Sequence, residues 1–430
     1  MNVQELYKQK HGSVDEALNM IKPGEFISVA YYACEPTMLL SRLHEVIDRV
    51  PDITVGPQGI CGPYPYVSLE YARKAHMGTT FHSANTRVLG DAGACDYTPA
   101  NLHHAGAMDT RTDKYTFYAA TVSPMDENGN FCFGVDAEVV PESLSRAKTI
   151  VLEVNPYVPF IPDGQLINIK DVDMVYESDR PMPVPPIPPI TDVERTIADN
   201  VLSLINDGDT IQLGIGAMPN AVGEGLLTKN DLGIYTEMMT ASMGKLMKAG
   251  VVTNKYKNLH KGKSVTSFIY GDNELYEYVN GREDIMMRPC AYVNNPFTIM
   301  QNDNLVSVNT CIQVDFTGQI CSESIGYRQF SGTGGAFDFA YGAFHSKGGR
   351  GIMALSSTAK HGTISKIAPM LDPGAVVSIP RNIADYIVTE YGIARLKDRP
   401  VRERVEQLIA IAHPDFREEL RKEARKMLYI

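Results

Sequence analysis

The stretch Ile234–Met239, with the sequence Ile-Tyr-Thr-Glu-Met-Met, holds a single acidic residue, Glu237, in an otherwise apolar or weakly polar run. The connection before it, Asn-Asp-Leu-Gly, is typical of a turn. Isoleucine, tyrosine and threonine favour a strand, and the two methionines extend the apolar run. We therefore predict a buried strand with a carboxylate at its end, where α/β folds collect catalytic groups. A glutamate that is merely exposed at a strand end, or paired with a lysine, explains the same six residues.

Composition and charge narrow the class of protein. The chain has 430 residues, of which 44% are hydrophobic and 21% charged, enough for two or three domains. Its formal net charge of −11 argues against nucleic acid as a partner, because phosphate backbones attract basic surfaces. The N-terminus is polar and unlike a signal peptide, and no run reaches the roughly 18 apolar residues of a membrane helix. We expect a cytoplasmic protein without a membrane partner.

The seven cysteines are scattered and include no Cys-x-x-Cys spacing. Such a pattern is typical of reduced thiols and not of a disulfide framework or a zinc site. We therefore expect no metal site.

Strands and helices alternate through the first part of the chain. Ser13–Glu16 carries a capping-box pattern that predicts the start of a helix. Phe26–Ala33 and Asp113–Val122 are predicted strands, and Thr37–Val50 is a predicted helix with apolar spacing. This alternation indicates an α/β domain.

A proline run marks the predicted domain boundary. Pro181–Pro189 contains six prolines in nine residues, which excludes a helix interior or a central strand and favours a stiff, extended linker. We therefore predict two α/β domains, residues 1–185 and 186–430. Thr191 then caps a predicted helix that runs to Ile205.

Two glycine clusters follow in the second domain. Gly214–Val222, after a predicted strand, lets backbone N–H groups approach an anion, although a tight turn explains it equally well. Pro219 stands where a dinucleotide fingerprint has its third glycine, which argues against a nicotinamide enzyme. Gly326–Phe339 mixes four glycines with aromatic residues and predicts an ordered loop close to a ligand.

These motifs together carry a family resemblance. Gly214–Val222 and Tyr235–Met238 resemble the acetyl-CoA hydrolase/transferase branch of the class I coenzyme A transferases. The same holds for further stretches, in order along the chain: Gln313–Ile320, Ser322–Gly326, Gln329–Gly335, Asp385–Ala394 and Ala412–Phe416. Within the family the chain is most similar to the 4-hydroxybutyrate and butyrate:acetate CoA-transferases.

The resemblance implies both a fold and a reaction. The fold is two tandem open α/β domains of the class I CoA-transferase (NagB/RpiA/CoA-transferase-like) type, with the active site at their interface. The reaction moves CoA between acetate and 4-hydroxybutyrate or butyrate by a ping-pong mechanism through a glutamyl-CoA thioester. Acyl-CoA and carboxylic acids would be the small-molecule substrates, with no permanently bound cofactor, and we expect a homo-oligomer, most simply a homodimer. The alternatives are an acyl-CoA hydrolase, a CoA-transferase for another short-chain or dicarboxylic acid, and a non-catalytic acyl-CoA-binding protein.

The resemblance also assigns site residues. Glu237 is the expected nucleophile, and Asn294 matches a family asparagine beside the catalytic carboxylate, although an asparagine in a turn near a proline is also common. Glu323 is a rival nucleophile, because its stretch resembles the Ser-Glu-Asn-Gly of other class I CoA-transferases, but the Thr-Glu-Met context favours Glu237. The expected oxyanion and CoA-binding positions are Ile215, Gly216, Gly334 and Gly335.

Three positions depart from the family pattern. Ala336 stands where many relatives have glutamine, and Asn295 and Tyr235 stand where they often have histidine. These departures surround the expected site, so they bear on the acyl substrate more than on the reaction.

Overall fold

The computed structural model describes residues 2–109, 116–186 and 188–430. They form two compact units, the first from residues 1–185 and 265–293 and the second from residues 186–264 and 294–430. Residues 265–293 therefore group with the first unit although they follow the proline run in the sequence. The division into domains 1–185 and 186–430 stays a prediction.

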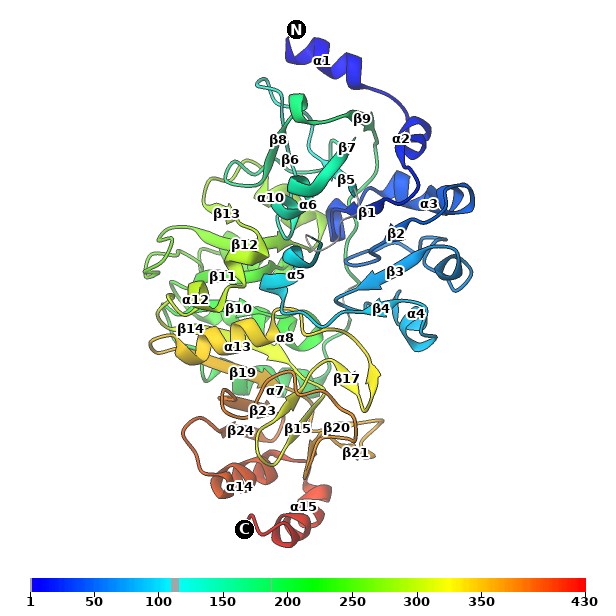
Figure 1. Ribbon diagram of the computed structural model, residues 1–430. Helices are drawn as coiled ribbons and strands as arrows, with labels where there is room; N and C mark the ends of the chain where they lie inside the picture. Colours follow the sequence, from blue (N-terminus) through cyan, green and yellow to red (C-terminus); the bar gives the residue numbers. More distant parts are fainter. Residues whose placement is uncertain (1, 110–115, 187) are drawn as a thin grey trace. The chain divides into compact units, whose positions relative to one another are not determined.

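The first unit is built on a parallel sheet of seven strands, visible in Figure 1. Their order is β4 (Asp96–Tyr97), β3 (His76–Thr79), β2 (Thr54–Val55), β1 (Phe26–Val29), β5 (Thr116–Val122), β7 (Ala147–Val154) and β9 (Met174–Glu177). β5 is buried along its whole length, as expected of a central strand covered on both faces. The predicted strand Asp113–Val122 corresponds to β5, and its first three residues lie outside the described residues.

One predicted strand of this unit is too long. The prediction Phe26–Ala33 extends beyond β1, which ends at Val29. A 3₁₀ turn, Tyr32–Cys34, follows, and Tyr32 has a φ of +51°. A left-handed residue cannot continue a strand, so the chain turns before the predicted end.

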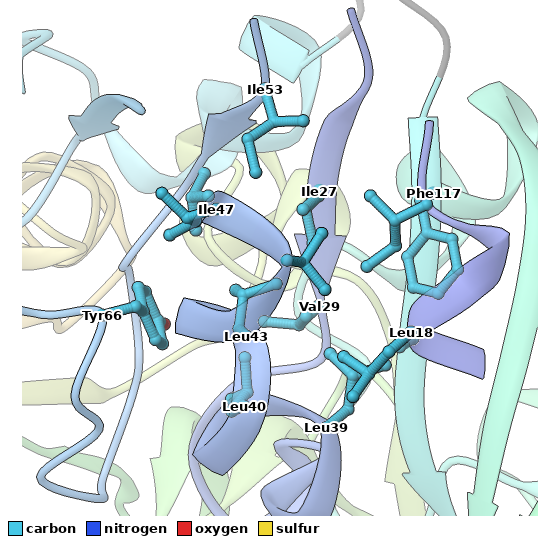
Figure 2. Close-up of a cluster of buried hydrophobic side chains, with 14 of the residues drawn as sticks. Leu18, Ile27, Val29, Leu39, Leu40, Leu43, Ile47, Ile53, Tyr66 and Phe117 are labelled. Atoms are coloured by element: carbon cyan, nitrogen blue, oxygen red, sulfur yellow. The ribbon is translucent and has the colours of Figure 1, made fainter. Parts of the chain in front are cut away.

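Helices of the first unit pack on this sheet and form its core. Ser13 caps α2 with the predicted capping box to Glu16, and α3 matches the predicted helix Thr37–Val50 to within one residue. Figure 2 shows Leu39, Leu40 and Leu43 of α3 in the buried cluster with side chains of β1 and β5. The helices are α1 (Val3–Lys10), α2 (Val14–Met20), α3 (Thr37–Arg49), α4 (Arg87–Asp91), α5 (Leu102–Asp109), α6 (Val140–Arg146), α10 (Asn273–Val279) and α11 (Cys290–Val293). The remaining strands include β6 (Asn130–Cys132), β8 (Leu166–Asn168), β12 (Ser264–Ile269) and β13 (Ile285–Met287).

The second unit has its own mainly parallel sheet, which carries the candidate site. Within this unit the strand order is β11 (Gly233–Met239), β10 (Thr210–Leu213), β14 (Leu305–Thr310), β19 (Arg350–Ala354), β23 (Tyr386–Thr389) and β24 (Gly392–Arg395), and only β24 is antiparallel to its neighbour. From β10 the chain continues to β11 on one side and later returns to β14 on the other. Open α/β sheets bind ligands outside the carboxyl ends of their strands at such a reversal of order.

The other elements of the second unit are helices and short strands. Thr191 caps α7, as predicted, and the structure adds a capping box to Glu194. The helix ends at Leu202 and not at Ile205. The helices are α7 (Asp192–Leu202), α8 (Ala217–Gly225), α9 (Ala241–Lys248), α12 (Pro296–Ile299), α13 (Ala336–His345), α14 (Val401–Ile411) and α15 (Pro414–Lys426). The short strands are β15 (Gln313–Asp315), β16 (Ile320–Cys321), β17 (Ser324–Ile325), β18 (Arg328–Gln329), β20 (Thr358–Ala359), β21 (Ile364–Ser365) and β22 (Ile367–Ala368).

The proline run is irregular but partly fixed. Its described residues form neither helix nor strand, in agreement with the predicted extended segment. Met182 is buried, and the Tyr276 hydroxyl donates a hydrogen bond of 2.8 Å to the carbonyl oxygen of Pro183. The first part of the run is therefore held by the first unit.

Two further features are the state of the cysteines and the character of the helices. None of the seven cysteines forms a disulfide, and six of them are buried. Nowhere in residues 2–109, 116–186 and 188–430 does a helix combine the length and apolar character needed to traverse a bilayer.

Candidate active site

Glu237 lies near the carboxyl end of β11 in the second unit. Its neighbours Thr236 and Met238 are buried, while Glu237 itself is partly exposed. The start of the strand is fixed from both sides of its backbone. The Ile234 amide donates to Asn254 Oδ1 (2.9 Å), and the Ile234 carbonyl accepts from Lys257 Nζ (2.8 Å). The carboxylate is therefore carried by a rigid element.

Asn294 is the hydrogen-bond donor to this carboxylate. Its side chain is fully buried, and its Nδ2 lies 2.7 Å from Glu237 Oε2. The next residue, Asn295, fixes the turn by accepting a hydrogen bond from the amide of Phe297 at the start of α12 (3.0 Å). Asn294 therefore approaches Glu237 from a constrained backbone, and an amide donor at this distance stabilises the ionised carboxylate.

Gly335 lies against both side chains. A Cβ atom built at Gly335 would be 1.8 Å from Glu237 Oε2 and 2.3 Å from Asn294 Nδ2. Only glycine fits at such distances. Gly335 is the N-cap of α13, and the ring of Phe339 from that helix lies 6.4 Å from the ring of Tyr235 on β11. The amino end of α13, which carries a partial positive charge, is thereby held beside the carboxylate.

The environment of Glu237 brings its titration close to neutral pH. Burial raises the pKa of Glu237 from an ordinary 4.5 to about 7, the hydrogen bond from Asn294 lowers it, and the charge of Asp338 raises it. A carboxylate of this kind is desolvated yet still ionised in a large fraction of molecules at pH 7. Nucleophilic catalysis by glutamate requires both properties.

Ile215 and Gly216 lie in the first glycine loop, at the carboxyl end of β10. The Ile215 side chain is 61% exposed, and Gly216 is the N-cap of α8 with a φ of +113°. No atom lies within 4 Å of a Cβ built at Gly216, so the space in front of it is open. Because β10 and β11 are neighbouring parallel strands, this loop and Glu237 share one edge of the sheet. The proposed role of Ile215, Gly216, Gly334 and Gly335 in binding an oxyanion or CoA stays a prediction.

The rival nucleophile, Glu323, occupies a different environment. Its side chain is buried, and both carboxylate oxygens accept hydrogen bonds from hydroxyl groups. Thr333 Oγ1 donates to Oε2 (2.9 Å) and Ser378 Oγ donates to Oε1 (3.2 Å). These contacts are typical of a carboxylate that holds surrounding structure.

Asp338 is a site residue that the sequence motifs did not predict. It is fully buried in the first turn of α13, three residues after Gly335, and its charge contributes to the raised pKa of Glu237. The available signal was an acidic residue in the first turn of a helix that follows a glycine loop. That signal predicts helix capping and not proximity to a second carboxylate.

Comparisons with known proteins agree with this architecture. Residues 1–188 match the acetyl-CoA hydrolase/transferase N-terminal domain, and residues 271–424 match the C-terminal domain. The chain is 39% identical to the 4-hydroxybutyrate coenzyme A transferase of Clostridium kluyveri, covering 99% of this chain and 100% of that protein. It is also 39% identical to the succinyl-CoA:cyclohexane-1-carboxylate CoA transferase of Geobacter metallireducens, covering 98% and 96%. The crystal structure of RipA from Yersinia pestis superposes with a TM-score of 0.94 at 37% identity over the whole of both chains.

Fold and sequence together define an enzyme of the CoA-transferase class, with two tandem α/β domains. The chain belongs to the acetyl-CoA hydrolase/transferase family. The family resemblance seen in the sequence motifs is thereby confirmed.

Proposed function

We propose that this enzyme transfers CoA between acetate and a short-chain acid, 4-hydroxybutyrate or butyrate, with Glu237 as the nucleophile. The observation that carries the proposal is the group formed by Glu237, Asn294 and Gly335. It combines a desolvated carboxylate with a pKa of about 7, a fixed amide donor at 2.7 Å and a helix amino end. The similarity to the Clostridium kluyveri transferase supports the choice of acids.

The first half-reaction begins with attack of the Glu237 carboxylate on the thioester carbonyl of the acyl-CoA. The C–S bond breaks, which leaves a mixed anhydride on Glu237 and a CoA thiolate. The thiolate then attacks the glutamyl carbonyl of the anhydride and expels the donor acid as its carboxylate. Glu237 now carries CoA as a thioester. The acceptor acid reverses both steps, so no net electron transfer or hydrolysis occurs.

Each step passes through a tetrahedral oxyanion. Backbone N–H donors aimed at such an oxygen stabilise it by several kcal/mol. We propose that the loops of Ile215–Gly216 and Gly334–Gly335 supply them. Asn294 acts on the nucleophile and not on the oxyanion in this scheme, since its amide group keeps the attacking carboxylate oriented and ionised.

Trapping of the covalent intermediate tests the proposal. Incubation with acetyl-CoA and no acceptor should accumulate the glutamyl-CoA thioester, which borohydride reduces to an alcohol while leaving free carboxylates intact. Peptide mass spectrometry should place the reduced residue in the peptide that contains Glu237. Glu237→Ala should abolish exchange with every acid. Reduction at Glu323, or full exchange by Glu237→Ala, would exclude Glu237 as the nucleophile.

A hydrolase is the second candidate, because water can attack the same glutamyl thioester. The two are separated by following both products of acetyl-CoA. A transferase should release acetate in step with the appearance of butyryl-CoA or 4-hydroxybutyryl-CoA, and only slowly without an acceptor acid. Release of acetate and free CoA at an unchanged rate without acceptor would identify a hydrolase. A panel of acceptors that includes succinate and cyclohexane-1-carboxylate would define the acid.

A further inference from the structure

Glu323 is a buried carboxylate that the mechanism above does not use. We infer that it is a positioning residue, which clamps the second glycine loop at the distance from Glu237 that the reaction needs. The inference rests on the proposed function, because it assigns Glu323 a supporting role for a nucleophile at Glu237.

The side chain of Glu323 ties two separate segments together. Oε2 accepts from the hydroxyl of Thr333, in the glycine loop (2.9 Å), and Oε1 accepts from the hydroxyl of Ser378 (3.2 Å). Ser378 is itself fixed, because its Oγ also accepts from the backbone amide of Ser322 (3.0 Å). The carboxylate therefore links the glycine loop to an anchored segment 45 residues further along the chain (378 − 333).

The main chain of Glu323 holds the same loop at its other end. Its carbonyl oxygen accepts from the amides of Phe330 (2.8 Å) and Ser331 (3.0 Å). These bonds close the β17–β18 hairpin, in which Ser324 pairs with Gln329 and Ile325 pairs with Arg328. One residue thus fixes both the beginning of the loop, through its backbone, and Thr333, through its side chain.

Thr333 lies only two residues before the point of contact with the nucleophile. Its carbonyl oxygen accepts from the amide of Ala336 (3.2 Å), which sets the bend through Gly334 and Gly335 into α13. A Cβ at Gly335 would come within 1.8 Å of Glu237 Oε2, so loop and nucleophile already lie in close contact. A small shift of Thr333 therefore changes the space between the loop backbone and the carboxylate. Displacements of about 1 Å at reacting groups can cost about a hundredfold in rate.

Two substitutions of Glu323 separate a clamp from a nucleophile. Glutamine keeps one acceptor oxygen for Thr333, and its NH2 group can donate to Ser378, whose hydroxyl can accept. Glu323→Gln should therefore keep kcat within about threefold of wild type, whereas a nucleophile would lose all exchange. Glu323→Ala releases both hydroxyls, and we expect kcat to fall by roughly 10- to 100-fold with a smaller change in the KM for acyl-CoA. In all of these variants borohydride should still reduce Glu237.

The hydroxyl partners provide a matched pair of controls. Thr333→Val removes the hydrogen bond toward the glycine loop at nearly constant volume and should reproduce the loss of kcat seen in Glu323→Ala. Thr333→Ser keeps the hydroxyl and should restore most of the rate. Ser378→Ala removes the anchor of the same carboxylate, so it should lower kcat in the same direction as Thr333→Val. The effects of Glu323→Ala and Thr333→Val on kcat should be far from additive, because both substitutions remove the same hydrogen bond between Thr333 and Glu323.

The possible outcomes are distinguishable. Absence of exchange by the wild-type enzyme with every acid would refute the proposed function, and this inference with it. An active wild type with wild-type kcat in both Glu323→Ala and Thr333→Val would refute the clamp alone. Complete loss of exchange in Glu323→Gln, with borohydride reduction at Glu323, would overturn both the clamp and the assignment of Glu237. A loss of kcat in Thr333→Val that Thr333→Ser does not relieve would show that the hydroxyl contact is not responsible and would also overturn the inference.

Discussion

Gly335→Ala is the substitution that most directly tests the contact between the glycine loop and Glu237. The added Cβ would lie 1.8 Å from Glu237 Oε2 and 2.3 Å from Asn294 Nδ2. Ordinary contact between carbon and oxygen needs about 3.3 Å, which is a little under the usual spacing of carbon atoms in contact. The carboxylate must therefore withdraw by roughly 1.5 Å, or the loop must move by as much.

A displacement of this size should cost at least about a hundredfold in kcat/KM, or about 2.7 kcal/mol in transition-state stabilisation. The assay is the exchange of acetyl-CoA with butyrate under initial-rate conditions. The hydrogen bond from Asn294 lowers the pKa of Glu237. Its disruption should therefore also shift the rise of kcat/KM with pH to a higher pH. Thermal unfolding should show that the variant still folds.

Gly351→Ala is the matched control in the same unit. The nearest atom to a Cβ at that position is the Ala340 carbonyl oxygen at 3.6 Å, which is ordinary van der Waals contact. We expect this variant to keep wild-type exchange. Exchange by Gly335→Ala within twofold of wild type would show that the loop does not constrain the carboxylate, and the arrangement of the site would have to be abandoned.

Four further predictions concern the site. The kcat/KM of the wild-type enzyme should rise with pH through about 7, because the carboxylate of Glu237 is the attacking form; a flat profile between pH 5.5 and 8.5 would contradict this assignment. The folded state binds the proton of Glu237 more tightly than the unfolded chain does, so this residue lowers the free energy of unfolding as pH rises from about 4.5 to 7. Glu237→Gln should therefore be more stable than wild type at pH 8, by at most about 3 kcal/mol in urea unfolding. Solvent screening of this partly exposed side chain reduces the difference. Asn294→Ala removes a hydrogen bond that stabilises the ionised form of Glu237, so its pH–rate midpoint should move above that of wild type and part of its activity should return at pH 9; an unchanged midpoint would refute the role of this amide. Ala336→Gln should change the relative kcat/KM among acids without abolishing exchange, since glutamine can hydrogen-bond an acyl group and alanine cannot, and an identical acid profile would place residue 336 outside the acyl pocket.

Local sequence patterns predicted individual helices and strands but not which of their residues come together in the candidate site. The strand around Glu237, the N-cap at Thr191 and the helix after Pro36 depend on neighbouring residues, and the structure confirms them. Asn294 and Gly335 reach Glu237 from 57 and 98 residues further along the chain (294 − 237 and 335 − 237), so only tertiary packing brings them together. The family resemblance predicted these positions, whereas the distances between them come only from the three-dimensional structure.

Glu323 shows the opposite limit. Its stretch suggested a rival nucleophile, because a glutamate among serines and glycines reads the same whether it reacts or supports a loop. The hydrogen bonds to Thr333 and Ser378 are the basis for the proposed supporting role, and one of those partners lies 55 residues away (378 − 323). The predicted strand Phe26–Ala33 failed for a related reason, since the backbone conformation of Tyr32 is not visible in its side-chain type.

The grouping of residues 265–293 with the first unit has a consequence for synthesis of the chain. The first unit cannot be complete when residue 185 has been translated, because β13, α10 and most of β12 are still to come. The ribosome must add another 108 residues (293 − 185), which at about 5–20 residues per second takes roughly 5–20 s. During that interval an unfinished unit is exposed to the cell while residues 186–264 of the second unit are being made. A fragment that stops at residue 185 should therefore depend on chaperones or aggregate, whereas one that extends to residue 293 carries every segment of the first unit.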